Sequence, residues 1–543
     1  MVASIRSLWG KMWDLHDQTK DTLLFFSTKT SNKGSKSSTQ SGQAENGNKD
    51  NDNKSYRSRA QNVGLVLGPL LFFIIIFLLS PPGMSKEATA VLASTAWIAT
   101  WWITEAIPIP ATSLLPIILF PLTGAVEGGV TSAYADNVIF LFLGGFFIAI
   151  AMEKWNLHRR IALNIILFVG TSTQRIILGF MVATGFLSMW ISNTATAMMM
   201  MPIGLAVIAH VNTSLNITNA KESKFGKAIM LGIAYAASIG GLGTLIGTPP
   251  NTIFVGIVRK LYGIDISFAT WMLFGVPIAT ILLFAVWFYL VKVAFPMDMK
   301  ELPGGKGVIQ DQKTDLGRMS SEEKIVAAVF IFAAVFWVTR TFIPLDIIQQ
   351  RVNDTTIAII AALLLFILPS KRGGNILAWK DAVNMPWGIL LLFGGGLAIA
   401  DGFKESGLAL YIGEQLTFLQ DVNLIIVLLV VITLVLFLTE ITSNTATATM
   451  MFPIMASFAA AINVHPYGLM IAAGVAASCA FMLPVATPPN AVVFGSGMLK
   501  ITDMVKAGFW INIACIFFIT AAIYFLLPLV WGIDLNVFPE SMR

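Results

Sequence analysis

Apolar runs long enough to cross a lipid bilayer recur along this chain from residue 63 almost to its end. A helix needs about 20 apolar residues to span the hydrocarbon core of a membrane, and only helices and closed barrels satisfy their backbone hydrogen bonds there. Hydrophobic residues make up 56% of the 543 residues and charged residues 12%, a balance that excludes an ordinary soluble domain. The sequence therefore predicts an all-α polytopic membrane protein.

Breaks at proline, glycine and charged residues divide the apolar sequence into eleven predicted transmembrane helices. They lie at 63–79, 87–103, 106–123, 137–153, 226–258, 267–294, 323–342, 354–369, 386–401, 466–498 and 505–531. Two further apolar segments, 175–208 and 424–462, are long enough to enter the membrane and return, and a polar cluster interrupts each near its middle. We expect both to be re-entrant hairpins, because non-helical backbone survives at membrane depth only where it lines a cavity in the protein.

The first 59 residues differ in composition from everything that follows. Apolar and basic residues at helical spacing within 1–27 predict a helix in the membrane interface, with a mobile tail as the alternative. Residues 28–56 contain no Val, Ile, Leu or Phe, so 28–59 is expected to be a disordered cytoplasmic arm. The first transmembrane helix then lies within 60–86.

Lysine and arginine predict the orientation of the chain in the membrane. With a cytoplasmic N-terminus, 28 of the 35 basic residues fall in cytoplasmic segments, as expected for loops on that side. The net charge of +5 is therefore interpreted as a topology signal, and no nucleic-acid partner is expected. After eleven crossings the C-terminus faces outward, and the predicted location is the plasma membrane.

Two polar motifs occur twice, in the same order. SNTATAM at 192–198 is matched by SNTATAT at 443–449, and GTPPN at 247–251 by ATPPN at 486–490. A weaker echo joins GFFIAIA at 145–151 to GGGLAIA at 394–400. The three offsets are 251, 239 and 249 residues, and three ordered matches at nearly one offset imply an internal duplication.

The duplication divides the chain into two repeats of opposite orientation. The first repeat covers 87–296 with the hairpin 175–208, and the second covers 323–535 with the hairpin 424–462. A cytoplasmic linker over 297–322 joins them. Five predicted crossings separate the hairpins, so the first opens inward and the second outward. Inverted repeats with paired broken helices are typical of secondary transporters.

The chemistry of the repeated motifs favours a small anion together with a hard cation. A Ser-Asn-Thr cluster at a hairpin tip offers hydroxyls, an amide and free N–H groups where the next helix begins, and this end of a helix attracts anions. Thr-Pro-Pro-Asn breaks its helix and exposes carbonyl oxygens suited to sodium. Neither motif contains Lys or Arg. Two symmetric tips built from neutral dipoles suit a ligand with two carboxylates whose charge a bound cation offsets.

Other interpretations remain open for single features. One SNT cluster alone would most often let helices pack closely, and one TPPN alone would most often be a turn. Glu440 is either a functional charge at membrane depth or a water-facing residue at the end of its hairpin. The two cysteines and four histidines form no spaced ligand set, so neither a metal centre nor a cofactor is expected. No nucleophile–base constellation is visible, which argues against an enzyme.

Across roughly residues 60–535, the duplicated SNT and TPPN motifs resemble those of the divalent anion/sodium symporters, the family that carries dicarboxylates and citrate; the likeness is to its bacterial dicarboxylate transporters. The resemblance implies a homodimer in which a scaffold domain supports a transport domain that moves as an elevator. It places the substrate carboxylates on ten residues: Ser192, Asn193, Thr194, Thr248, Pro249, Ser443, Asn444, Thr445, Thr487 and Pro488.

The same resemblance implies two sodium sites. The first would consist of Ser188, Ser192, Asn193 and Gly247, and the second of Thr439, Thr442, Asn444 and Ala486. Thr442 departs from the family, in which a smaller residue is usual at this position: its carbonyl ligand would survive, but its side chain adds bulk at the second sodium site.

The sequence as a whole predicts secondary active transport of C4 and C5 dicarboxylates such as succinate, malate, fumarate or 2-oxoglutarate, driven by sodium symport. Sodium-independent exchange of one dicarboxylate for another is an alternative within transport. Citrate and sulfate are alternative substrates, because each presents several anionic oxygens. An anion channel would share the hairpins, but it would not show saturable uptake with counterflow.

Overall fold

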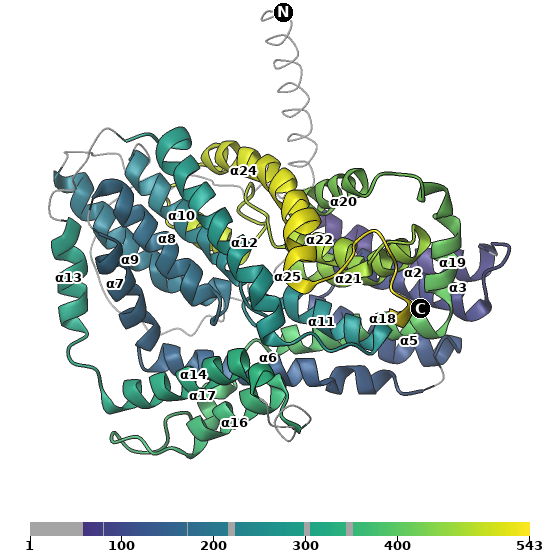
Figure 1. The fold of residues 1–543 in the computed structure, drawn as a ribbon, viewed down its shortest axis with the longest axis horizontal. Coiled ribbons are helices and arrows are strands. Elements are labelled where there is room, and N and C mark those ends of the chain that lie inside the picture. Colours follow the sequence, from purple (N-terminus) through teal and green to yellow (C-terminus); the bar gives the residue numbers. More distant parts are fainter. Residues whose placement is uncertain are drawn as a thin grey trace, which may run out of the picture.

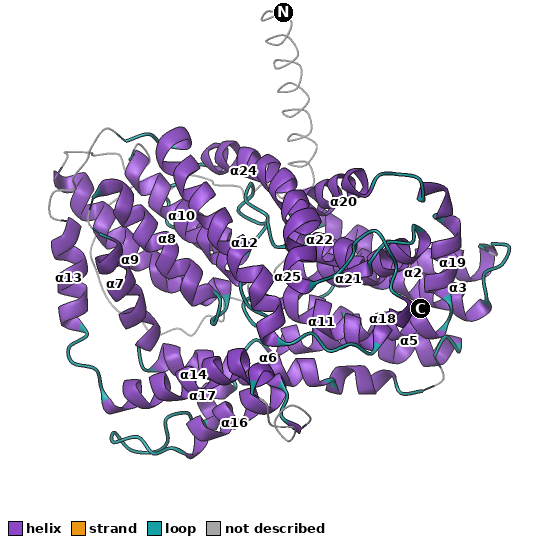
Figure 2. Ribbon diagram, in the orientation of Figure 1, coloured by secondary structure: helices purple, strands orange, loops and turns teal. Residues whose placement is uncertain are grey.

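The structure is a computed structural model of the chain, and it describes residues 58–79, 81–126, 128–170, 172–214, 223–297, 305–343 and 351–542. The described residues form helices and connecting loops and no strand (Figure 2). This confirms the predicted all-α membrane fold. The predicted interfacial helix over 1–27 and the arm 28–59, apart from its last two residues, lie outside the described residues.

Every predicted crossing coincides with one helix or with two consecutive helices. The single helices are α2 (Arg59–Leu78), α3 (Lys86–Thr104), α6 (Asn137–Lys154), α12 (Phe268–Tyr289), α14 (Ser321–Thr339), α16 (Asp354–Ile367), α18 (Trp387–Glu405) and α24 (Ile501–Ala521). The pairs are α4 (Ile109–Thr112) with α5 (Leu115–Thr123), α10 (Lys224–Gly241) with α11 (Pro249–Tyr262), and α22 (Pro466–Ala477) with α23 (Pro488–Gly495). Among the described helices, seven are individually long and apolar enough to cross a membrane.

Both predicted hairpins are pairs of packed helices joined by four residues. The first consists of α8 (Thr173–Ser188) and α9 (Asn193–Ser214), and the second of α20 (Leu424–Thr439) and α21 (Asn444–Ala461). The first hairpin is longer than the predicted 175–208, because α9 continues six residues further. Each SNT motif begins the second helix of its hairpin.

Several helices were not expected. α7 (Leu157–Val169) is too short to be a crossing and buries one face against α8, through Leu157, Ala162, Leu163 and Ile166. α13 (Gly305–Asp315) lies within the predicted linker and packs against α7 and α9. α19 (Leu408–Gln415) packs against α21. The remaining short elements are α17 (Trp379–Ala382), α25 (Leu527–Trp531), η1 (Val130–Ala135), η4 (Arg340–Phe342), η5 (Thr417–Leu419), η7 (Glu540–Met542), and two π turns, η3 (Leu290–Ala294) and η6 (Ala522–Leu526).

Polar residues in this apolar chain are placed where helices begin. The side chains of Ser85, Asp136 and Ser267 accept hydrogen bonds from the first turns of α3, α6 and α12. Ser320 does the same for α14, where Glu323 completes a reciprocal capping box. These caps satisfy N–H groups that the helix itself leaves unpaired, so they explain why the crossings start where they do.

The two repeats are intertwined at the broken helices. α11 follows the break of the first repeat but packs against α21 and α22 of the second (Figure 1). In the same way, α23 follows the break of the second repeat and packs against α9 and α10 of the first. Each half-helix thus lies next to the hairpin of the other repeat, which brings both pairs of motifs into one region.

Candidate functional site

A hydroxyl fastens each hairpin tip to the broken helix of its own repeat. In the first repeat, the hydroxyl of Ser188 contacts the amide of Asn193 and lies 2.6 Å from the carbonyl oxygen of Ala237 on α10. In the second, Thr439 Oγ1 lies 2.8 Å from Asn444 Oδ1 and 2.9 Å from the carbonyl oxygen of Ala477 on α22. The two halves therefore repeat one arrangement, in which the last hydroxyl before the tip joins the SNT asparagine to the half-helix.

The amide of Asn193 lies among oxygen atoms. With its nitrogen turned toward them, it donates to the carbonyl oxygens of Ala237 at 3.1 Å and Gly247 at 3.2 Å and to the hydroxyl of Ser188. If the oxygen is turned inward instead, the amide adds one more ligand to a cluster of oxygens suited to a hard cation.

A buried asparagine closes each helix break. Asn251 Nδ2 donates to the carbonyl oxygens of Gly241 at 3.0 Å, Leu242 at 3.4 Å and Thr244 at 2.8 Å. In the second repeat, Asn490 Nδ2 donates to Ala480 at 3.2 Å and Leu483 at 3.0 Å. The last residue of each TPPN motif therefore satisfies carbonyl groups that the end of the preceding half-helix leaves unpaired. Neither asparagine was among the predicted site residues.

Four helices, α9, α11, α21 and α23, begin in the same region of the structure. α9 and α21 start at the asparagines of the two SNT motifs, and α11 and α23 start at the prolines of the two TPPN motifs. Proline fits this position because the first N–H of a helix has no partner within the helix. The N-terminal end of each helix carries a partial positive charge. The convergence of four such ends creates a positive region without a basic side chain.

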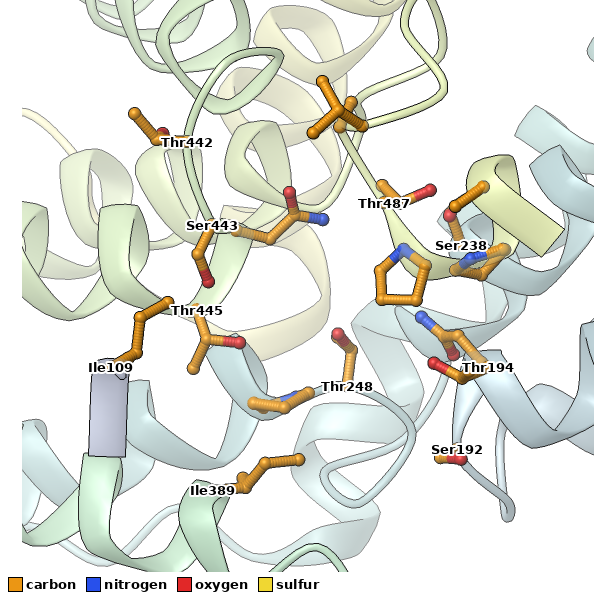
Figure 3. A pocket seen from close by; sticks show the side chains of 18 of the residues that line it. Ile109, Ser192, Thr194, Ser238, Thr248, Ile389, Thr442, Ser443, Thr445 and Thr487 are labelled. Carbon is orange, nitrogen blue, oxygen red and sulfur yellow. The ribbon is translucent and has the colours of Figure 1, made fainter. Parts of the chain in front are cut away.

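These helix starts surround a cavity of about 660 Å³, within the range of small-molecule sites (Figure 3). All ten residues predicted to bind substrate line it: Ser192, Asn193, Thr194, Thr248, Pro249, Ser443, Asn444, Thr445, Thr487 and Pro488. Ser443 and Thr445 face Thr248 and Thr194 from the opposite hairpin (Figure 3). The structure thus brings together residues that are up to 296 positions apart in the sequence.

The predicted sodium ligands lie at the same cavity or directly behind it. Ser192, Asn193, Gly247, Thr442, Asn444 and Ala486 line the cavity, while Ser188 and Thr439 are fully buried behind the tips. The hydroxyl of Thr442 lies 2.8 Å from the carbonyl oxygen of Leu438 and 2.6 Å from the hydroxyl of Thr447. The side chain of Thr442 therefore forms hydrogen bonds within its own hairpin. The atoms that make Thr442 larger than the residue expected at this position are used in these contacts.

Several lining residues were not predicted from the sequence. The additional polar ones are Ser58, Gln61, Thr104, Glu105 and Ser238, and Phe142, Phe146, Ile109, Ile246, Ile389 and Val485 are among the apolar ones. Ser238 lies on the half-helix just before GTPPN, a position that could have been inferred. Among the described residues that line the cavity, Glu105 alone is ionisable and none is basic.

Glu440 is buried, and its interpretation as a water-facing residue is wrong. Its side chain is 3% exposed. It lies in the turn of the second hairpin and accepts hydrogen bonds from three consecutive backbone N–H groups and from Asn512. It does not line the cavity.

A helical membrane protein in which two hairpin tips and two helix breaks enclose one polar cavity has the architecture of a transporter. The family described as "Sodium:sulfate symporter transmembrane region" matches residues 59–535. The chain belongs to this family, which confirms the resemblance carried by its motifs.

Two curated relatives of high sequence identity agree with this membership. A sodium-dependent dicarboxylate transporter, SdcS, of Staphylococcus saprophyticus is 53% identical over 492 residues, 89% of this chain and 95% of the relative. SdcS of Staphylococcus aureus is 51% identical over 486 residues, 88% of this chain and 94% of the relative. The names of these relatives confirm the expectation of a transporter in place of an enzyme.

Two solved transporter structures share the fold at low sequence identity. YdaH of Alcanivorax borkumensis covers 87% of this chain and 97% of its own, with a TM-score of 0.50 and 11% identity. MtrF of Neisseria gonorrhoeae covers 84% and 97%, with a TM-score of 0.53 and 12% identity.

Proposed function

We propose that the protein is a secondary active transporter of C4 and C5 dicarboxylates, coupled to sodium. The observation that carries this proposal is the convergence of all ten motif residues on one cavity of about 660 Å³. The relatives of 53% and 51% identity, described as sodium-dependent dicarboxylate transporters, support the same substrate class and the same coupling ion.

The shape of the site supports a ligand with two anionic ends. The SNT tips and TPPN breaks of both repeats offer hydroxyls, amides and helix N-termini around the cavity, with Ser443 and Thr445 on one side and Thr194 and Thr487 on the other (Figure 3). Each carboxylate of succinate, malate, fumarate or 2-oxoglutarate would bind one of these half-sites. Neutral dipoles bind an anion less firmly than a basic side chain does, because they carry only partial charges. Such a site suits a substrate that must also be released.

The oxygen clusters behind the tips support sodium as the coupling ion. In the first half, the Ser188 hydroxyl, the Asn193 amide and the Gly247 carbonyl lie together. In the second half, Thr439 and Asn444 repeat the contact. Hard cations prefer oxygen ligands of these kinds. A cation at each tip would offset the charge of a dicarboxylate in a cavity that lacks basic residues among its described lining.

The intertwined repeats support an elevator mechanism. Because α11 and α23 each pack against the other repeat, the two hairpins and the two broken helices form one interlocked unit. We propose that this unit is the transport domain, that it moves against a scaffold, and that the protein is a homodimer in the plasma membrane. We propose further that the N-terminus is cytoplasmic and the C-terminus outside.

Uptake of labelled succinate into proteoliposomes tests the proposal. One preparation has an inward sodium gradient and no internal substrate, and the other has internal succinate and no sodium. We expect concentrative uptake only in the first. Uptake only in the second would establish exchange and overturn sodium coupling. Unlabelled citrate and sulfate, added in excess outside, test the substrate class, because strong inhibition by sulfate alone would contradict a dicarboxylate site.

A further inference from the structure

A single carboxylate binds the polypeptide backbone at the second helix break. Glu440 Oε1 accepts from the N–H groups of Phe481 at 2.8 Å and Met482 at 2.9 Å, and Oε2 accepts from Leu483 N–H at 3.1 Å. Asn512 Nδ2, on α24, donates to Oε1 at 2.6 Å. One side chain in the turn of the hairpin thus joins the hairpin, the break and a neighbouring helix.

The first break is closed without any charge. Thr244 donates its hydroxyl proton to the carbonyl oxygen of Met189, which stands at the position equivalent to Glu440. The indole N–H of Trp271 donates to the carbonyl oxygen of Leu242 at 3.0 Å. The two halves share the hydroxyl and asparagine contacts of the site, but they differ in how the break is attached to the hairpin tip.

Glycine explains why the first break needs no such attachment. A Cβ atom on Gly247 would stand 2.5 Å from the carbonyl oxygen of Gly241, so this break closes only because both positions lack a side chain. The second break has Ala486 at the position equivalent to Gly247. It cannot close as tightly. It runs over 478–487 and has no regular turn at 479–481, whereas the first occupies 242–248 as consecutive turns and bends.

The irregular stretch of the second break leaves N–H groups outside any helix, and Glu440 accepts hydrogen bonds from three of them, those of Phe481, Met482 and Leu483. Ala486 and Thr487, which line the cavity, follow after a turn in which Ala486 N donates to the carbonyl oxygen of Leu483 at 3.2 Å. A carboxylate that fixes 481–483 therefore also fixes where the cavity-lining end of the break lies. Buried charges survive only when they are fully hydrogen-bonded, and Glu440 has four donors.

We propose that Glu440, held by Asn512, is a positioning residue that sets the geometry of the second half-site. This inference rests on the proposed function, because it assigns Glu440 a role in binding substrate and sodium through Ala486 and Thr487. Glu440 touches neither ligand. Its loss disturbs the second half-site and leaves the first half-site intact.

The first test compares Glu440→Gln and Glu440→Asp with wild type in sodium-driven succinate uptake. Gln keeps the length of the side chain but faces the Leu483 N–H with a donor, and Asp is one methylene too short to reach all four donors. We expect Gln to raise the succinate KM about tenfold or more and to shift sodium activation to higher concentration, with a smaller change in kcat. Asp should restore part of the loss. Glu414→Gln, on exposed Glu414, is the matched control, and unchanged KM and sodium activation in Glu440→Gln would overturn the proposal.

The second test does not depend on transport. Val485→Cys and Ile246→Cys place a thiol at the cavity on the second and first break, and native Cys479 and Cys515 are buried. Val485 is 78% exposed and Ile246 is 8% exposed, so each labelling rate by a polar maleimide is compared with that of the same Cys in an otherwise wild-type protein. In the Glu440→Gln background we expect a changed rate at 485 and an unchanged rate at 246. Equal changes at both positions would indicate general loosening and contradict the proposal.

Two outcomes separate this proposal from the proposed function. If wild type fails to transport dicarboxylates but the labelling still changes at 485 alone, the substrate assignment fails and the positioning role stands. If Glu440→Gln does not fold, Asn512→Ala removes one of the four hydrogen bonds and is expected to raise KM about threefold. A wild-type KM in a folded Asn512→Ala protein would then overturn the role of Asn512 and Glu440 together.

Discussion

Asn251 and Asn490, which close the two helix breaks, allow a quantitative prediction. Both donate to backbone carbonyl groups of their own break, but they differ in the number and length of their hydrogen bonds. Asn251 and Asn490 are 1% and 0% exposed. Asn251→Ala removes two bonds of 2.8 and 3.0 Å and a weaker contact of 3.4 Å. The carbonyl oxygen of Gly241 loses its donor, which costs about 1 to 3 kcal/mol. The carbonyl oxygens of Leu242 and Thr244 each keep a second donor, Trp271 Nε1 and Gly247 N, so the bonds lost there cost about 1 kcal/mol more. We therefore expect Asn251→Ala to reduce the free energy of unfolding by roughly 2 to 4 kcal/mol.

Asn490→Ala should reduce the free energy of unfolding by less than Asn251→Ala does. It removes two bonds of 3.0 and 3.2 Å. It also removes the Oδ1 atom of Asn490, which is buried and has no hydrogen-bond partner within the described part of the chain. Loss of an unpaired buried acceptor is favourable by about 1 kcal/mol, which leaves a net loss of roughly 1 to 3 kcal/mol. The two breaks should therefore differ in stability although the motif is the same.

Thermal unfolding of the purified protein in detergent, monitored by tryptophan fluorescence, measures the order of the two variants. Asn375→Ala is the control, because the exposed Asn375 also donates to a backbone carbonyl, that of Phe366, and substitutions at exposed sites usually change stability by less than about 0.5 kcal/mol. The isosteric Asn251→Asp, which replaces the donor by a charged acceptor, should be worse than Asn251→Ala. The reasoning would be refuted if Asn251→Ala melted at the same temperature as wild type, or if its melting temperature fell by less than that of Asn490→Ala.

Three further predictions concern transport and pH. Asn193→Ala and Asn444→Ala should each abolish succinate uptake while membrane insertion and monodispersity are kept, because each removes the amide at one half-site; near-normal uptake by either variant would count against the site. Deletion of 28–56 should leave the uptake rate nearly unchanged, and a large loss would show that this segment is more than a linker. Burial lowers the pKa of His465 to about 4, against the opposing charge of Asp534. The unfolded state therefore takes up the proton first, and stability should be complete above about pH 6.5 and fall as the pH drops toward 4. His465→Asn, which keeps a helix-capping acceptor, should flatten this part of the melting profile, and an unchanged profile would assign the titration to another group.

Some parts of the fold could be predicted because they depend on local sequence. Apolar length predicted the crossings, since a lipid environment requires whole helices. The two prolines of TPPN predicted the breaks, since proline cannot continue a helix. α7 and α13 were missed, because a short amphipathic helix gives no crossing signal, and the end of α9 was placed too early.

The candidate site, like the fold, could be predicted from the sequence only in part. Its ten predicted residues came from the family resemblance that the duplicated motifs carry, and the structure places all ten at one cavity. Asn251 and Asn490 belong to the same motifs, but their role depends on the carbonyls that they meet. Glu105 and Phe142 carry no repeated signal, and only packing brings them to the cavity.

The sequence by itself determined that this is a helical membrane protein with two copies of one half-site, because periodicity, apolar length and repetition are properties of the chain. Tertiary structure alone decided that the copies share one cavity, since α11 and α23 cross to the opposite repeat. It also decided which hydrogen-bond donors surround Glu440. A buried carboxylate is stable only when hydrogen-bond donors surround it. The donors of Glu440 include Phe481 and Asn512, which are 41 and 72 positions away in the sequence and which the fold brings within hydrogen-bonding distance.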